Sequence, residues 1–165
     1  NEAWGQFDTP EVVKFTRELD PTRLINPASG GNYDFSAGVK GFGDILDVHH
    51  YPCPAMNVFE RKFVNVLGEY GGIGYPIEGH TWIIDRKWGY GKVKESSEEL
   101  MKQYEDYLEM LKTFVTNGCA AAVYTQTTDV EGEVNGLMTY DRKIIKVDMP
   151  RISAANKAVI ESMSK

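Results

Sequence analysis

Short and almost continuous apolar runs alternate with amphipathic stretches along this chain. The runs lie at 23–26, 44–49, 63–67 and 120–124, and each is followed by polar, Pro-containing or Gly-rich sequence. Apolar runs of this length are typical of parallel strands covered on the outside by helices. We therefore expect four buried parallel strands in an α/β fold.

Three amphipathic stretches carry helix signals. The stretch 8–19 opens with a capping residue, a proline and an acid, and the second opens with the capping box 96–99 and ends before Gly118. A third helix is predicted to begin at Pro150. The apolar positions of the first helix are Val12, Phe15, Thr16 and Leu19.

Composition narrows the class of protein. The 165 residues carry a net charge of −6 and are 42% hydrophobic, as expected for a globular domain with a real core. No run approaches the roughly 20 apolar residues of a membrane helix, and the acidic balance argues against a nucleic-acid partner. Cys53 and Cys119 show no metal-type spacing, and they leave the compartment open, with periplasmic and secreted locations both possible.

Polar side chains gather where the predicted strands end. Tyr51, Glu69 and Tyr124 lie at such ends, which is where ligands bind in (β/α)8 barrels and in open doubly wound sheets. A complete barrel needs about 250 residues. The chain also begins at Asn1 without an initiator Met, so we expect a single domain, 1–165, that is part of a longer protein and supplies about half a barrel.

Two glutamates are candidates for acid/base and nucleophilic chemistry. Hydrolysis of a glycosidic bond requires two carboxyl groups, one on each side of the anomeric carbon. Glu2 lies near the start of the chain, and Glu69 lies between a buried strand and a glycine turn, where a charge is costly and needs a reason. A lone glutamate at a strand end is more often a salt-bridge partner, so Glu69 alone does not decide the function.

Four short motifs occur in a specific order: Asn1-Glu2, His49-His50-Tyr51, Gly-Glu-Tyr-Gly-Gly at 68–72, and Tyr124-Thr125-Gln126. This order resembles glycoside hydrolase family 2, the β-galactosidase and β-glucuronidase family. The resemblance implies the C-terminal half of a (β/α)8 barrel, from the end of strand four to strand eight. It also implies retaining hydrolysis of a β-galactoside or related β-glycoside, with Glu2 as acid/base and Glu69 as nucleophile.

The same resemblance implies further roles. Asn1 matches the residue that binds the sugar 2-hydroxyl, and Tyr51 matches the tyrosine that orients the nucleophile. His49 and Tyr124 stand where the family commonly has Asn and Trp, so they bear on substrate choice. No cofactor and no metal are implied.

The remaining candidates leave alternatives open. Adjacent strand residues point to opposite faces, so His49 and His50 cannot both enter one metal site, with His80 as a third ligand, without a distortion. We expect one of the pair to face the pocket and the other to pack under a helix. Aromatic side chains in the loops either stack on sugar rings or plug the loops onto the barrel. They are Trp4, Trp82, Trp88 and Tyr90.

Two loops complete the predicted site. The segment 71–94 is long for a βα loop, which favours a functional role. The acidic run Asp129, Glu131 and Glu133 is interpreted as a solvated rim, with hydroxyl binding as the alternative. Competing functions are a folded carbohydrate-binding or structural half barrel without turnover, and a metal-dependent hydrolase. A half barrel leaves sheet edges unpaired, so we also expect association with a second copy.

Overall fold

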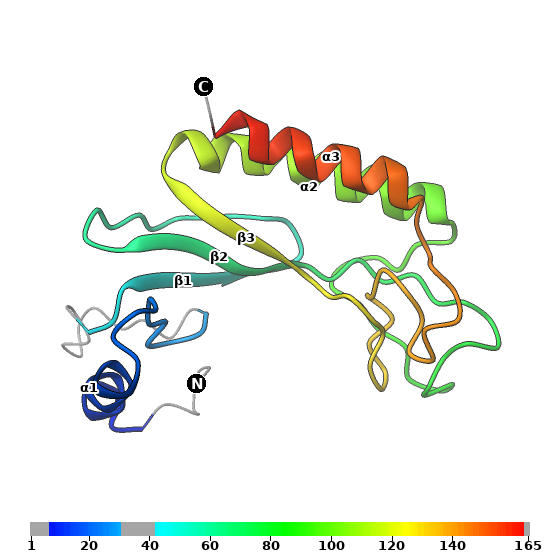
Figure 1. Cartoon of the computed structure of the whole chain (residues 1–165). Helices are drawn as coiled ribbons and strands as arrows, with labels where there is room; N and C mark the ends of the chain where they lie inside the picture. Colours follow the sequence, from blue (N-terminus) through cyan, green and yellow to red (C-terminus); the bar gives the residue numbers. More distant parts are fainter. Residues whose placement is uncertain (1–6, 31–41, 164–165) are drawn as a thin grey trace.

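A parallel three-stranded sheet with helices on one face forms the centre of the molecule (Figure 1). The computed structural model describes residues 7–30 and 42–163. The strands are β1 (Ile45–His50), β2 (Val64–Gly71) and β3 (Cys119–Thr125), paired in the order β1-β2-β3. The helices are α1 (Thr9–Leu19), α2 (Ser97–Thr116) and α3 (Met149–Ser162). The predicted α/β class and its parallel strands are confirmed.

The run 23–26 does not form the predicted fourth strand, and that prediction is wrong. The segment lies beside the start of β1, where the Ile25 carbonyl accepts hydrogen bonds from the amides of Asp44 (2.8 Å) and Ile45 (3.3 Å). Pro27 follows at once, and because proline has no N–H to donate, the backbone pairing is interrupted at this point.

Helix α1 forms where the sequence predicts it, but its apolar stripe is not covered. Phe15 and Leu19 are 61% and 70% exposed, and Val13 is the buried residue of this helix. Asp8 adopts a left-handed conformation and makes no side-chain capping bond, so Pro10 and Glu11 remain as the start signals.

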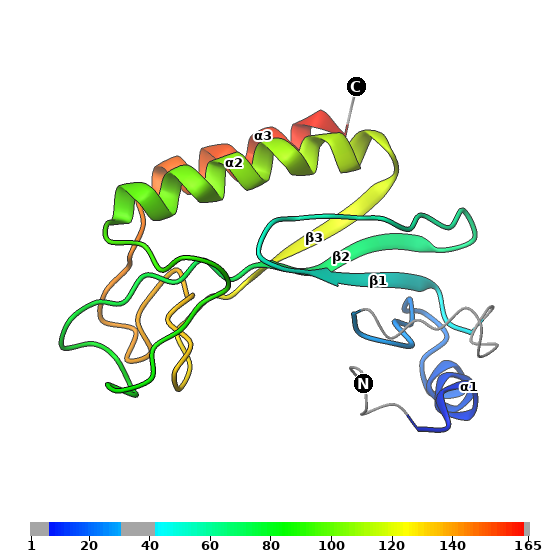
Figure 2. The same ribbon diagram turned by 180° about the vertical axis from the view of Figure 1, so that it is seen from behind.

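Helices α2 and α3 run side by side over one face of the sheet (Figures 1 and 2). Ser96 caps α2 as predicted, with its Oγ accepting from the Glu99 amide, but the Glu99 carboxylate accepts from the amide of Glu95, one residue before the cap, instead of from Ser96. Gly118 follows the helix at φ +102°, as expected for a residue that ends a helix. Arg151 of α3 donates to Glu105 of α2 at 2.6 Å, which joins the two helices.

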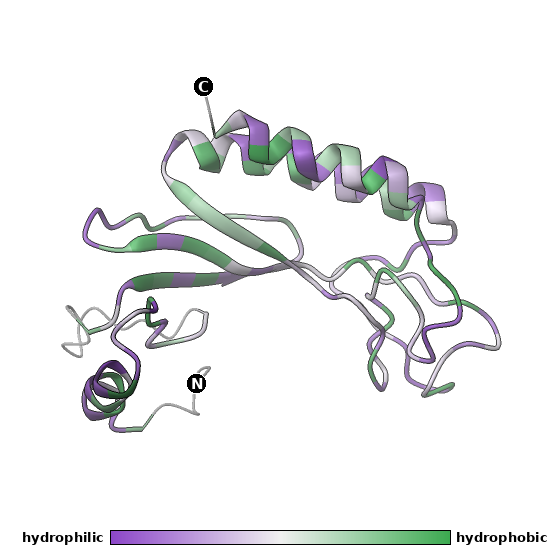
Figure 3. Cartoon of the chain, in the orientation of Figure 1, coloured by the Kyte–Doolittle hydropathy of each residue, from purple (hydrophilic) through white to green (hydrophobic). Residues whose placement is uncertain are grey.

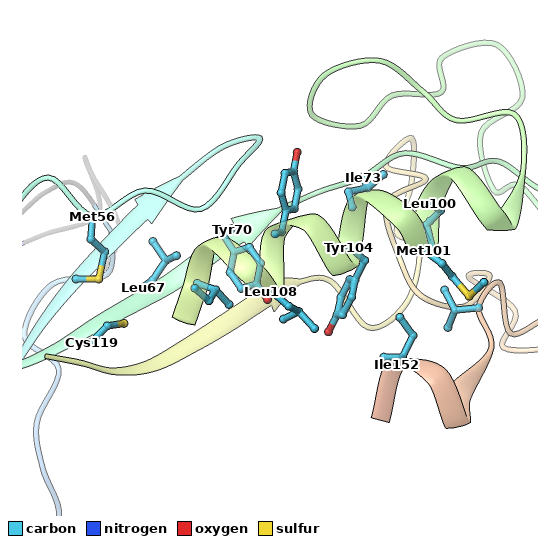
Figure 4. Packing of buried hydrophobic residues seen from close by; sticks show 13 residues of the cluster. Met56, Leu67, Tyr70, Ile73, Leu100, Met101, Tyr104, Leu108, Cys119 and Ile152 are labelled. Carbon is cyan, nitrogen blue, oxygen red and sulfur yellow. The ribbon is translucent and has the colours of Figure 1, made fainter. Parts of the chain in front are cut away.

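The main core lies between these helices and the sheet (Figure 4). Leu67 of β2 and Leu100 of α2 are fully buried there, and Tyr70 and Tyr104 are almost fully buried. β3 is mostly apolar, whereas hydrophilic positions interrupt β1 and β2 and recur along both long helices (Figure 3). Each buried large side chain contributes about 1.5–3 kcal/mol, so this layer supplies much of the folding free energy.

The outer edge of β3 pairs with no further strand among the described residues, whereas Ile25 lies beside the start of β1. β1 and β3 flank β2, and the residues Ala120–Val123 of β3 are exposed, with Val123 at 53%. In residues 7–30 and 42–163, no helix combines the length and apolar character needed to cross a bilayer.

Candidate active site

Polar side chains from three neighbouring strand ends meet at the carboxyl edge of the sheet. Tyr51, just after β1, donates a hydrogen bond to Glu69 Oε2 of β2 at 2.6 Å. The Tyr51 oxygen also lies 2.7 Å from the hydroxyl of Thr125, the last residue of β3. The Tyr51 hydroxyl has one hydrogen to donate, and this hydrogen bond goes to the carboxylate. The Thr125 hydroxyl is therefore the donor in its contact with Tyr51. The three residues form one hydrogen-bonded row across the sheet.

A β-bulge decides which way Glu69 points. Leu67 pairs with Val48 and Glu69 pairs with His49, which leaves Gly68 as an extra residue in β2. Side chains two apart normally share a face, and Leu67 lies in the helix-covered core. The extra residue turns Glu69 to the opposite face, where its side chain is 38% exposed, while Tyr70 returns to the core.

Only glycine fits at the bulge. A Cβ at position 68 would collide with the carboxylate of Asp47 on the neighbouring strand. Asp47 is itself buried and accepts a hydrogen bond from Asn26 Nδ2 at 2.6 Å. The close approach of β1 and β2 at this point therefore depends on Gly68.

His49 lies between two carboxylates. It shares the face of Asp47, two residues earlier, and its Nε2 is 3.6 Å from Asp47 Oδ1. Its Nδ1 is 3.4 Å from Glu69 Oε2, and its side chain is 8% exposed. Of the histidine pair, His49 is thus the one that faces Glu69. His50 is exposed and contacts the Cys53 carbonyl at 2.7 Å, so the expectation that the second histidine packs under a helix is wrong.

An aromatic stack surrounds Tyr51. Its ring lies 3.7 Å from that of Tyr90 and nearly parallel to it, and Trp88 meets Tyr90 edge-on at 5.4 Å. Burial, followed by the hydrogen bond to the Glu69 carboxylate, raises the pKa of Tyr51. Tyr51 therefore remains protonated at neutral pH and donates to Glu69.

Tyr124 lies on the helix side of β3, although the sequence suggests a place beside the substrate. Its ring packs against Tyr104 at 4.9 Å, and its hydroxyl accepts from the Ile73 amide and donates to the Asn135 carbonyl. Burial raises its pKa. Thr125, the next residue, contacts Tyr51 in its place.

The other predicted residues are distributed as follows. Trp82 is 58% exposed and contacts Tyr140 at 5.9 Å, in a second aromatic pair. Asn1, Glu2 and Trp4 lie outside the described residues.

The acidic run after β3 is not uniformly a solvated rim. Asp129 is buried and accepts from Lys146 Nζ at 2.6 Å and from the Gly136 amide at 2.8 Å, so the rim interpretation is wrong for this residue. Burial raises the pKa of Asp129 and lowers that of Lys146, while their hydrogen bond opposes both shifts. Glu131 is exposed, as a rim residue should be.

The histidines do not converge. His80 contacts Asp141 Oδ2 at 2.8 Å in the loops, away from the contacts of His49 and His50. Over residues 7–30 and 42–163, no group of three His, Cys, Asp or Glu side chains is arranged to hold a metal ion. Cys53 and Cys119 are free thiols.

Sequence reasoning included Thr125 and Gly68 in motifs without giving either a role, and it gave no role to Asp47. Thr125 could have been found from strand alternation, because a core position for Tyr124 places its neighbour on the other face. Asp47 carries a comparable signal, since it lies two residues before His49 in an otherwise apolar run. No model of a protein family matches this sequence, and a search of curated proteins gives no match either.

Proposed function

We propose that this protein is a retaining glycoside hydrolase in which Glu69 is the nucleophile and Glu2 the general acid/base. The observation that carries the proposal is the setting of Glu69, a partly exposed carboxylate at a strand end that a protonated tyrosine holds at 2.6 Å. The role of Glu2 rests on the resemblance of the Asn1-Glu2 motif to glycoside hydrolase family 2.

The contacts of Glu69 suggest how its two oxygens divide the work. Tyr51 and His49 both approach Oε2, at 2.6 and 3.4 Å. Oε1 is then the oxygen that attacks the anomeric carbon, while Glu2 protonates the departing oxygen. The resulting glycosyl ester retains the Tyr51 hydrogen bond on its carbonyl oxygen. Glu2 next removes a proton from the water that hydrolyses the ester.

The finer fold assignment is part of the same proposal. We assign β1, β2 and β3 to strands six, seven and eight of a (β/α)8 barrel, of which this chain supplies the C-terminal half. Three observations support it: parallel pairing in chain order, polar side chains at the carboxyl ends, and an outer strand, β3, that pairs only with β2 among the described residues.

Self-association is a consequence of that assignment. The exposed strand β3 and the uncovered apolar residues Phe15 and Leu19 of α1 are surfaces that a second copy could cover. Sedimentation of the chain should show a dimer or larger species whose proportion rises with concentration. A clean monomer at high concentration would contradict it.

Replacing the nucleophile tests the proposal directly. In the full-length protein, Glu69→Ala should lower turnover of an aryl β-galactoside by about 10⁴-fold or more. Glu78→Ala, an exposed glutamate in the loop after β2, should leave turnover unchanged. A 2-deoxy-2-fluoro glycoside should add one sugar mass to the peptide that contains Glu69.

Other outcomes separate the competing functions. Undiminished turnover in Glu69→Ala would show that the nucleophile assignment is wrong. Sugar binding without turnover in the unaltered protein would favour a carbohydrate-binding module, and loss of turnover with a chelator would favour a metal-dependent hydrolase.

A further inference from the structure

A compact polar network lies in the loop that follows β3. Gln126 Nε2 donates to Glu133 Oε2 at 2.9 Å and to Asn135 Oδ1 at 2.8 Å. Asn135 Nδ2 donates to the same Glu133 oxygen at 3.0 Å. Both hydrogens of the Gln126 amide nitrogen are used in this way, and Glu133 Oε2 receives two donors.

The network leaves two acceptors open toward solvent. Within the part of the chain that the structure describes, Glu133 Oε1 and Gln126 Oε1 receive no hydrogen bond. The fully buried side-chain oxygens without a partner are those of Asp47 and Asp129 among the described residues. The open oxygens of Glu133 and Gln126 are therefore accessible to solvent. Adjacent acceptors of this kind bind a ligand that brings donors, such as the hydroxyl groups of a sugar.

Two series of neighbouring residues connect these acceptors to the Glu69 site. Gln126 directly follows Thr125, whose hydroxyl contacts Tyr51. Glu133 pairs with Trp88 in a short bridge, and paired residues place their side chains on the same face. Trp88 contacts Tyr90, and Tyr90 stacks on Tyr51.

Buried contacts on both sides of Glu133 hold the network in place. Asn135 is completely buried, and Lys146 donates both to Asp129 at 2.6 Å and to the Val134 carbonyl at 3.2 Å. These contacts fix the loop on both sides of Glu133 before any ligand arrives. Preorganised polar groups of this kind are what a selective binding site requires.

We propose that Glu133 and Gln126 bind hydroxyl groups of the substrate and make the enzyme select neutral glycosides against uronides. The proposal rests on the glycosidase function proposed above. A neutral sugar offers hydroxyl donors to both open acceptors. In the proposed arrangement C6 of the sugar lies beside Glu133, so a uronide would place its own carboxylate there, and two like charges in a partly buried site repel each other.

Matched substrates that differ only at C6 provide the test. The unaltered protein should have a kcat/KM for an aryl β-galactoside about 100-fold above that for the aryl β-galacturonide. Glu133→Gln removes the charge and keeps an acceptor, so it should reduce this ratio about tenfold, chiefly by faster uronide turnover. Glu131→Gln removes a charge from the exposed neighbour and should leave the ratio unchanged.

Two measurements, the kcat/KM ratio and sugar binding, distinguish failure of this proposal from failure of the glycosidase function. A ratio in Glu133→Gln equal to that in Glu131→Gln, or a uronide preference in the unaltered protein, would overturn the selectivity proposal while turnover persists.

If no glycoside is hydrolysed, the binding of galactose and of galacturonate, measured by saturation-transfer NMR, tests the selectivity proposal. Equal binding of the two sugars would overturn the proposal, and weaker binding of galacturonate that Glu133→Gln relieves would support it. Equal melting temperatures of the two variants exclude a folding effect.

Discussion

Asp47 occupies the space that a side chain at position 68 would need, so the carboxylate of β1 and the glycine of β2 interlock. The interlock lies directly beside the bulge that turns Glu69 away from the core. It couples a packing contact between two strands to the direction of the proposed nucleophile.

Gly68→Ala should therefore impair both stability and turnover. The added methyl group forces the strands apart, with an expected loss of about 1–3 kcal/mol in the free energy of unfolding, measured in urea. A displacement of Glu69 by about 1 Å should lower kcat/KM about 100-fold. In the double variant with Asp47→Ala, part of the lost stability should return. Strictly additive losses would show that the two residues do not interlock.

Tyr51→Phe isolates the hydrogen bond to Glu69. The phenyl ring can still stack on Tyr90, so the melting temperature should change little. Loss of the donor should lower kcat about 10–100-fold, because the carboxylate loses its positioning contact. Thr125→Val, which removes only the contact behind Tyr51, should have a smaller effect. An unchanged kcat in Tyr51→Phe would argue against the role of Tyr51 in orienting Glu69.

Lys146→Met should strongly destabilise the protein. The substitution leaves Asp129 buried beside an apolar side chain, and breaking a buried ion pair in this way costs about 3–5 kcal/mol. Combining it with Asp129→Leu should recover most of the loss, because no uncompensated charge then remains. Urea unfolding of the single and double variants provides the measurement. A double variant as unstable as the single one would count against the charge as the cause.

The hydrogen bonds of Asp141 should stabilise the folded state above pH about 4. The Thr139 hydroxyl, His80 and the Lys143 amide bind its carboxylate and hold its pKa at about 2, below the usual 3.8. The folded pKa is depressed, so the contribution is complete above pH about 4 and is lost as the pH falls toward 2. The urea midpoint should fall less steeply over this range in Asp141→Asn. Parallel pH profiles would contradict this.

Much of the fold could be predicted from the sequence, because its signals are local. Capping residues, Gly118 and continuous apolar runs identified α2 and all three strands. The prediction of a strand at 23–26 was wrong. Neither the length nor the composition of this run shows whether it can form a continuous ladder with a neighbouring strand. Likewise, the periodicity of α1 predicts its helix but not which surface covers Phe15.

The site was less predictable because it depends on contacts between strands. The motif at 68–72 singles out Glu69, but only the pairing of β2 with β1 shows that Gly68 is an extra residue. Tyr124 and Thr125 are adjacent in the sequence, and the face that each occupies is decided by packing against α2. Asp129 looks solvated in the sequence because its partner Lys146 lies 17 positions later.

Helices α2 and α3 cover one face of the sheet, and the side chains of Tyr51, Glu69 and Thr125 lie on the other. Different substitutions can therefore alter the free energy of unfolding and the catalytic activity. Substitutions at distant positions on the two faces should add independently. Substitutions that improve packing in the helix layer would raise the free energy of unfolding. The protein would then remain folded when destabilising substitutions change the specificity at the opposite face.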